Sequence, residues 1–205
     1  MYPKIKRAGD FLLSLTGIIF TGWLMAIIAV CIKAESKGNV IFKQKRIGQG
    51  KKDFYIYKFR TMYTDTPKDM PTHLLKDPEA YITRCGKILR RTSLDELPQF
   101  FNILKGDMSI IGPRPALWNQ YDLIAERDKY EANDVPVGLT GWAQINGRDE
   151  LSIVDKARFD GEYTRKMSLL FDIKIFFMTI ASVFSEKGVV EGYQDNSRNE
   201  ESKSV

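Results

Sequence analysis

The sequence KILRRTSLDELPQFFNILKGDMSIIGPRP, residues 87–115, decides the fold and the chemistry of this chain. It places an acidic pair, Asp95 and Glu96, shortly after the basic pair Arg90-Arg91, and it ends in a Gly-Pro-Arg-Pro corner around Arg114. Carboxylates beside arginines on stiff backbone are what phosphate chemistry with a metal ion requires. The stretch therefore predicts a phosphate site, and the rest of the chain indicates what surrounds it.

Pro98 interrupts the helical pattern directly after the acidic pair. The chain must kink there or begin a new helix with Pro98 in its first turn. Ser93 and Glu96 also fit a capping box, which offers a purely structural role for Glu96 but none for Asp95. Free backbone N–H groups at a helix break favour anions, so we expect a low pKa that keeps Asp95 ionised. Neighbouring helical residues point about 100° apart, which suits two roles around one metal ion better than an acid–base couple.

For other basic residues the sequence gives weaker evidence of phosphate binding. The prolines on both sides of Arg114 fix its backbone, which favours bidentate contact with a phosphate. The alternation in residues 54–60 points Lys58 and Arg60 to the same side of a predicted strand, and spacing alone favours a solvated face there. The Asn-Gly turn before Arg148 presents that arginine at its edge.

Residues 11–32, FLLSLTGIIFTGWLMAIIAVCI, carry no charge and are long enough to cross a hydrocarbon core of about 30 Å as a helix. The run lacks the small-residue cleavage site of a signal peptide, so we interpret it as retained. Lysines and arginines on both flanks favour the cytoplasm and anionic head groups. A segment with two cytoplasmic flanks could enter one leaflet and return, with a break at Thr21-Gly22. A plain spanning helix is the alternative.

The remaining pattern predicts short strands, helices and a polar tail. Strands at 40–42 and 54–59 form a hairpin, a helical pattern begins at Glu79, and residues 118–134 form a charged helix. Residues 153–187 form two helices, the second of which packs in the core or lies at a lipid surface. We expect three regions: a membrane-inserted helix (1–33), a catalytic domain (34–190) and a disordered tail (191–205).

The composition argues against several classes of function. The 205 residues carry a net charge of +5, which suggests an anionic partner. A single histidine, His73, argues against histidine-based triads and metal sites, and two distant cysteines argue against a disulfide framework. Basic residues without a recognition motif argue against nucleic acid as the partner.

The motifs SLDELPQ, KGDMS and GPRP, preceded by VIFKQKRIG and FYIYKFRTM and followed by GLTGWAQINGRDEL, together resemble the small monotopic phosphoglycosyl transferases. The similarity runs from about residue 4 to residue 190. It implies an α/β fold that is mostly helical with a small β-hairpin or sheet. It also implies a re-entrant N-terminal membrane helix and a catalytic domain with interfacial amphipathic helices on the cytoplasmic face of the bacterial inner membrane.

The resemblance also implies a reaction. Such enzymes move a sugar-1-phosphate from a UDP-sugar to polyprenyl (undecaprenyl) phosphate and release UMP, as the first membrane step of glycoconjugate assembly. By this resemblance Asp95 is the nucleophile that forms a covalent phosphosugar intermediate, and Glu96 with Asp95 holds Mg²⁺. The implied substrate-binding residues are Arg90, Arg114, Arg148, Lys58 and Arg60.

The sequence departs from the family pattern at two places. Family members often carry Ser-Pro midway along the membrane segment, where this chain has Thr21-Gly22-Trp23. Residues 135–138, Val-Pro-Val-Gly, stand where Arg-Pro-Gly is frequent, which removes one substrate-binding arginine. The alternative function is a non-enzymatic, membrane-anchored basic module that binds anionic lipids, and it leaves Asp95 and Glu96 unexplained. The interfacial aromatic residues permit a homodimer without requiring one.

Overall fold

The computed structural model describes residues 2–66, 78–147 and 150–184, and this part of the chain is mostly helical with two small sheets. The predicted fold class is thereby confirmed in its coarse form. In chain order the elements are α1 (Tyr2–Glu35), β1 (Ile41–Ile47), η1 (Gln49–Lys51), β2 (Asp53–Phe59), α2 (Pro78–Tyr81), α3 (Arg84–Arg91), η3 (Leu94–Glu96), α4 (Gln99–Lys105), β3 (Ser109–Ile111), α5 (Tyr121–Asp128), β4 (Gly138–Thr140), α6 (Trp142–Ile145), α7 (Ile153–Lys166) and α8 (Leu169–Phe184).

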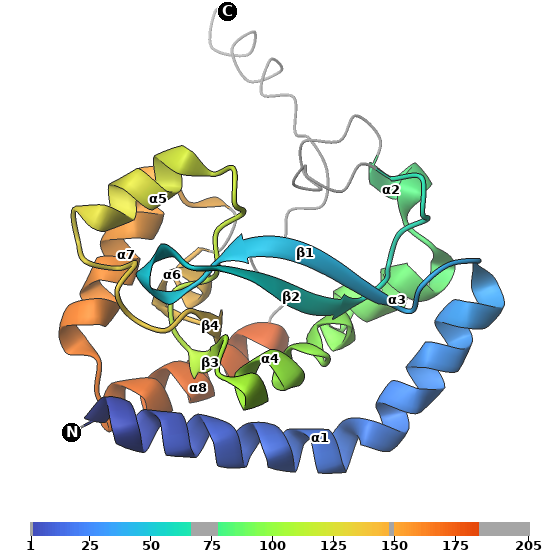
Figure 1. The fold of residues 1–205 in the computed structure, drawn as a ribbon, viewed down its shortest axis with the longest axis horizontal. Coiled ribbons are helices and arrows are strands. Elements are labelled where there is room, and N and C mark those ends of the chain that lie inside the picture. The colour runs from blue at the N-terminus through green and yellow to red at the C-terminus, as the bar shows by residue number, and fades with distance from the viewer. Residues whose placement is uncertain (1, 67–77, 148–149, 185–205) are drawn as a thin grey trace, which may run out of the picture.

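Helix α1 is a continuous 34-residue helix that bends and lies along one side of the rest of the molecule (Figure 1). By length and composition it could cross a membrane, and only 17% of its most apolar window is buried. The Thr21 hydroxyl donates a hydrogen bond to the Gly17 carbonyl at 2.7 Å, a contact of the kind that bends helices. The bent helix leaves large apolar side chains exposed, among them Ile19, Phe20 and Trp23.

The N-terminal end of α1 is fixed to the protein by polar contacts. Lys6 is buried, and its ammonium donates to Asp172 of α8 at 2.6 Å. The Arg7 guanidinium donates to the last carbonyls of α4, at 2.7 and 2.8 Å. The Asp10 carboxylate accepts from the Ile110 N–H of β3 at 3.0 Å. Three elements therefore hold this end of the helix.

The C-terminal end of α1 is fixed to the same part of the molecule. Ile28 and Ile32 pack in a buried cluster with Phe59 of β2 and Leu89 of α3. The Glu35 carboxylate accepts the first two backbone N–H groups of α3, at 2.7 and 2.9 Å. Both ends of this apolar helix thus contact the same body.

The predicted hairpin is confirmed, and its strands are longer than expected. β1 and β2 pair antiparallel with Phe42 opposite Lys58 and Ile41 opposite Phe59. The helical pattern that begins at Glu79 proves to be two helices. The first ends at Tyr81, and Thr83 caps the second by accepting from the Gly86 N–H at 2.9 Å.

The acidic segment differs from the predicted capping box. Ser93 has a φ of 55°, in the left-handed region, and its side chain makes no capping hydrogen bond. The chain then forms the 3₁₀ turn η3, and Pro98 stands directly before α4. Of the two alternatives at Pro98, the chain takes the new helix. Glu96 is therefore free of the structural role that the sequence offered it.

The C-terminal half contains a second sheet and the helices that pack against it. β3 and β4 pair parallel, and β4 falls in a turn-rich stretch for which no strand was predicted. A Cβ on Gly112 would lie 2.2 Å from the Pro136 carbonyl, and one on Gly141 would lie 2.1 Å from the Gly112 carbonyl, so these glycines allow close backbone contact. The two predicted C-terminal helices are α7 and α8, and Tyr163 and Ile175 are fully buried with Ile111 beneath them. The predicted tail lies outside the described residues.

Candidate active site

Charged side chains from three segments meet at η3. Lys58 comes from β2, Asp95 and Glu96 from η3, and Arg114 from the corner after β3. The Lys58 ammonium and the Arg114 guanidinium each lie 2.7 Å from Oε1 of Glu96. The Lys58 ammonium lies 3.9 Å from Oδ2 of Asp95. The structure thus brings together four of the residues to which the sequence and the family resemblance pointed.

The two carboxylates have opposite electrostatic surroundings. Burial raises the pKa of Asp95, and Glu96 raises it further, against the lowering effect of Lys58 and the nearby arginines. Burial would raise the pKa of Glu96 as well, but Arg114 and Lys58 outweigh it and hold that pKa well below its usual range. The expected low pKa for Asp95 is therefore wrong. Burial outweighs the lowering effect of the nearby cations on the pKa of Asp95.

Arg90 and Arg60 occupy different positions. The Arg90 Nε donates to the Thr61 hydroxyl at 3.0 Å, and the Arg90 charge lowers the pKa of Asp95, which places it beside the acidic pair. The Arg60 guanidinium donates to the backbone carbonyls of Ser36 and Lys37, just beyond the end of α1. These contacts give Arg60 a structural role. Its predicted contact with substrate stays a prediction.

Arg148, the remaining predicted substrate-binding residue, lies outside the described residues. Its predicted contact with substrate phosphate also stays a prediction.

The position of Arg114 depends on a buried ion pair that the sequence did not reveal. Arg127 of α5 donates to the Arg114 carbonyl at 2.9 Å and to Oδ2 of Asp160 on α7. Arg127 and Asp160 are both buried, at 4% and 1% exposure. Each lies in a helix with many charged residues, where an arginine or an aspartate is usually a surface residue. Their burial in the folded structure is what shows that they support Arg114.

Asn102 fixes the strand that carries Lys58. Its side chain is fully buried, accepts from the Tyr57 N–H at 2.9 Å and donates to the Tyr55 carbonyl at 2.8 Å. The backbone on the N-terminal side of Lys58 is therefore anchored to α4. The signal in the sequence was a lone amide inside the apolar pattern FFNIL, and it was not recognised.

The acidic pair fits a magnesium ion in ligand type. Mg²⁺ is usually held by one or two carboxylates, with substrate phosphates and water completing its coordination. Across residues 2–66, 78–147 and 150–184 no cluster of three or more acidic, histidine or cysteine side chains occurs. Asp95 and Glu96 could provide two carboxylates, provided that Glu96 shares Oε1 with its cations or binds through its other oxygen.

This arrangement defines a class of protein. Three cations, Lys58, Arg90 and Arg114, surround two carboxylates, so the site has a positive charge in excess that a diphosphate would neutralise. Asp95 is the buried carboxylate that Lys58 approaches less closely, at 3.9 Å, and a carboxylate is among the side chains that can act as nucleophiles. The geometry is that of a phosphate-transfer site beside an exposed apolar helix.

Comparison with known proteins gives the family. A family described as "Bacterial sugar transferase" matches residues 1–186. The chain therefore belongs to the bacterial sugar transferases.

Individual relatives carry more specific names. The UDP-glucose:undecaprenyl-phosphate glucose-1-phosphate transferase of Escherichia coli K12 is 42% identical over 89% of this chain and 41% of its own length. A UDP-N-acetylgalactosamine-undecaprenyl-phosphate N-acetylgalactosaminephosphotransferase of Aeromonas hydrophila is 39% identical over 92% of this chain and 45% of its own. The uncharacterized sugar transferase EpsL of Bacillus subtilis is 42% identical over 89% and 86%. The chain thus spans less than half of the first two relatives and most of the third.

Proposed function

We propose that this protein transfers a sugar-1-phosphate from a UDP-sugar to a polyprenyl phosphate such as undecaprenyl phosphate, with release of UMP. The relatives from E. coli and A. hydrophila are named for this type of reaction. The observation that carries the proposal is the pairing of Glu96 with both Lys58 and Arg114 at 2.7 Å, with Asp95 beside them at the longer distance of 3.9 Å from the Lys58 ammonium.

In the proposed mechanism Asp95 attacks the phosphorus atom that bears the sugar. A carboxylate oxygen of Asp95 forms a bond to that phosphorus, and the bond to the oxygen of UMP breaks. The acceptor's phosphate oxygen then attacks the same phosphorus and displaces Asp95, which leaves a polyprenyl diphosphate sugar. Lys58, Arg90 and Arg114 would bind the diphosphate oxygens and offset their developing charge.

We further propose that Mg²⁺ binds at this site. Glu96, with Asp95 as a second ligand, would hold the ion, and the donor types fit. When bound, the ion would supply charge neutralisation on the transferring phosphate. Ion pairing to Lys58 and Arg114 keeps Glu96 ionised and oriented.

We propose that α1 enters the cytoplasmic leaflet of a bacterial inner membrane and returns to the same face. Two observations support this topology: the bend of the helix and the fixation of both its ends to one body, through Lys6 with Asp172 and through Glu35 with the start of α3 (Figure 1). A straight spanning helix would have to break one of these sets of contacts.

Helix α8 would lie at the surface of the same membrane. Its buried side holds Ile175, while a series of large apolar side chains on the same helix is exposed. These exposed residues are Leu169, Leu170, Ile173, Phe176, Phe177, Met178 and Ile180. Basic residues that flank α1 would contact anionic head groups.

The test of the function is a release assay. The full chain is incubated with Mg²⁺, undecaprenyl phosphate and a panel of UDP-sugars, and UMP and lipid-linked product are measured. We expect UMP release that depends on both the lipid phosphate and one of the sugars. Failure to release UMP with every UDP-sugar of the panel would contradict the proposal.

A further inference from the structure

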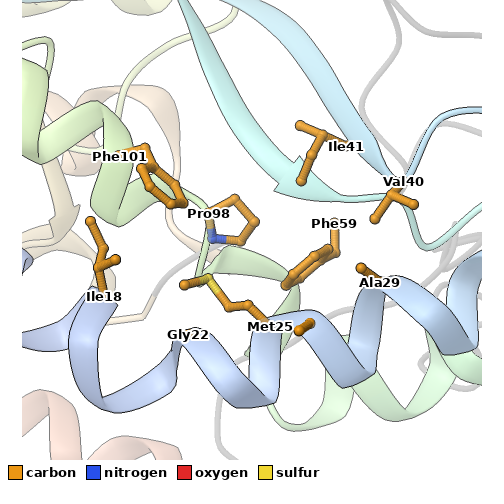
Figure 2. A pocket seen from close by; sticks show the side chains of 10 residues that line it. Ile18, Gly22, Met25, Ala29, Val40, Ile41, Phe59, Pro98 and Phe101 are labelled. Atoms are coloured by element: carbon orange, nitrogen blue, oxygen red, sulfur yellow. The ribbon is translucent and has the colours of Figure 1, made fainter.

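An apolar pocket of about 450 Å³ lies between α1 and the segment that follows the acidic pair (Figure 2). This volume falls within the range of small-ligand sites, about 300–1,000 Å³. Side chains from α1, the hairpin and the start of α4 point toward one another around it. The walls carry no charged group and include Ile18, Gly22, Met25, Phe59, Pro98 and Phe101.

The pocket is built by two of the segments that carry the charged site. Pro98 follows Glu96 by two residues, and Phe59 directly follows Lys58 on β2. The backbone that places the cations and carboxylates therefore also builds a wall of the pocket.

The helix that forms one wall of the pocket also carries exposed apolar side chains. Phe20 and Trp23, close to Gly22 in the sequence, are 73% and 67% exposed. A molecule that contacts both this helix and the charged site needs an apolar part and an anionic part. Its shape and charge would be those of a lipid phosphate.

We propose that this pocket holds the first isoprenoid units of the acceptor lipid and thereby sets the position of its phosphate relative to Asp95. The inference rests on the proposed function, because it is that function which requires a polyprenyl phosphate. The charges at Lys58 and Arg114 match the head of such a lipid, and the uncharged walls match the chain directly attached to it.

The pocket contributes position more than affinity. The chain of the acceptor comes from a bilayer that is as apolar as the pocket, so its transfer gives little hydrophobic free energy. Holding the chain beside Pro98 instead fixes the direction from which the lipid phosphate approaches, which is the kind of orientation that accelerates a reaction between two bound groups.

Gly22 offers a way to fill the pocket without disturbing the fold. A Cβ at Gly22 would meet no heavy atom within 4 Å, so a larger side chain would extend into open space. Gly9 meets the same condition on the same helix and does not line the pocket. Gly22→Leu and Gly9→Leu therefore form a matched pair, since both replace a helical glycine by leucine.

The kinetic test compares these two variants as full chains in nanodiscs. Filling the pocket should lower kcat/KM for undecaprenyl phosphate about tenfold or more, a size expected for a steric change in an apolar pocket. The KM for the UDP-sugar should stay unchanged, and Gly9→Leu should behave as wild type. Equal acceptor kinetics in both variants would overturn the proposal.

A second test does not depend on turnover. A polyprenyl phosphate with a photoreactive group in its first isoprenoid units is cross-linked to the protein, and the labelled peptides are identified by mass spectrometry. Fragmentation that locates the label should find it on the pocket-lining residues Ile18, Met25 and Pro98 of the wild type and of Gly9→Leu. This label should be lost in Gly22→Leu and should be competed by unlabelled undecaprenyl phosphate.

Label that phosphatidylglycerol competes equally, or that falls only on Phe20 and Trp23, would show general contact with lipid and overturn the pocket assignment. If the wild type releases no UMP but cross-links as expected, the proposed function fails while the pocket stands. If it releases UMP without this label, the pocket fails while the function stands.

Discussion

Two clusters of acidic and basic side chains meet at Arg114, and they differ in how well their charges are matched. In the buried cluster, Arg127 contacts Asp160 at 2.6 Å, with side-chain exposures of 5% and 1%. In the candidate active site, one carboxylate oxygen of Glu96 forms ion pairs with both Lys58 and Arg114, and the Arg114 side chain is 41% exposed. One cluster pairs each charge with a partner, whereas the other shares one carboxylate oxygen between two cations.

The difference separates a supporting role from a chemical one. A matched buried pair adds little net stability, but it fixes geometry, and losing one partner is costly. The Arg127–Asp160 pair uses that rigidity to hold the backbone carbonyl of Arg114. The unmatched cluster keeps a positive excess and a buried Asp95 whose charged form is disfavoured. Such a site gains most when a phosphate binds.

The largest expected effect is that of Asp95→Asn. The amide has the same shape but is a poor nucleophile, so UMP release should fall about a thousandfold or more. Because the pKa of Asp95 is raised in the folded protein, its favourable contribution to stability exists at low pH and is lost as the pH rises through that pKa. Asp95→Asn should therefore unfold at a higher temperature than wild type at pH 7. Loss of activity together with a lower Tm would contradict this account.

Glu96→Gln should lower activity about a hundredfold and also destabilise the fold. The substitution leaves Lys58 and Arg114 without their shared carboxylate, at a cost of about 2 kcal/mol or more. The pKa of Glu96 is lowered in the folded protein, so its contribution is present at neutral pH and is lost as the pH falls through that pKa. Chemical denaturation at pH 7 measures the effect.

The control for Glu96→Gln is Glu79→Gln, which removes an exposed ion pair with Lys87. We expect a change of less than about 1 kcal/mol there. Equal destabilisation by the two substitutions would show that the ion pairs of Glu96 stabilise the fold no more than an exposed pair does.

Arg127→Lys tests whether the buried cluster supports the site. Lysine keeps the charge opposite Asp160 but lacks the planar fork that also reaches the Arg114 carbonyl. We expect kcat/KM for the UDP-sugar to fall about tenfold, because Arg114 would be held less firmly. Arg158→Lys, which alters an exposed pair with Asp155 on the same helix as Asp160, should have no effect. A lower Tm with unchanged kcat/KM would reduce Arg127 to a purely structural role.

The smallest expected effect is a shift in pH dependence. Activity should fall as the pH decreases through the pKa of Asp95, which burial raises from its ordinary value. Lys58 makes the largest lowering contribution to that pKa, so Lys58→Gln should move the acid limb of its residual activity to higher pH. Lys45→Gln, at an exposed pair with Asp53, should leave the limb in place. An unmoved limb in Lys58→Gln would show that another group controls it.

Local signals predicted much of the fold. The hairpin, the break at Pro98 and the two C-terminal helices each follow from residue types within one segment. The split at Thr83, the absence of a capping box at Ser93 and the strand β4 were missed. The split and the strand depend on contacts with distant backbone, as when the Thr83 N–H donates to the Thr61 carbonyl and Gly138 packs against Gly112.

The sequence indicated the candidate site residues whose types suit phosphate chemistry. It did not indicate the residues that hold them in position. Asp95 was predicted to be a site residue because no structural role accounted for it. Lys58 looked like a solvated strand residue, because alternation along a strand cannot reveal that η3 packs against β2. Arg127 and Asp160 belong to two different helices, and only the tertiary structure places them under Arg114.

The central claim is that Asp95 forms the covalent bond to the sugar phosphate. Its direct test is intact-protein mass spectrometry after incubation with Mg²⁺ and the active UDP-sugar in the absence of lipid acceptor. We predict a mass increase of one sugar phosphate, located on Asp95, absent in Asp95→Asn and discharged when polyprenyl phosphate is added. An adduct on another residue, or UMP release only in the presence of the lipid and with no adduct, would contradict the claim.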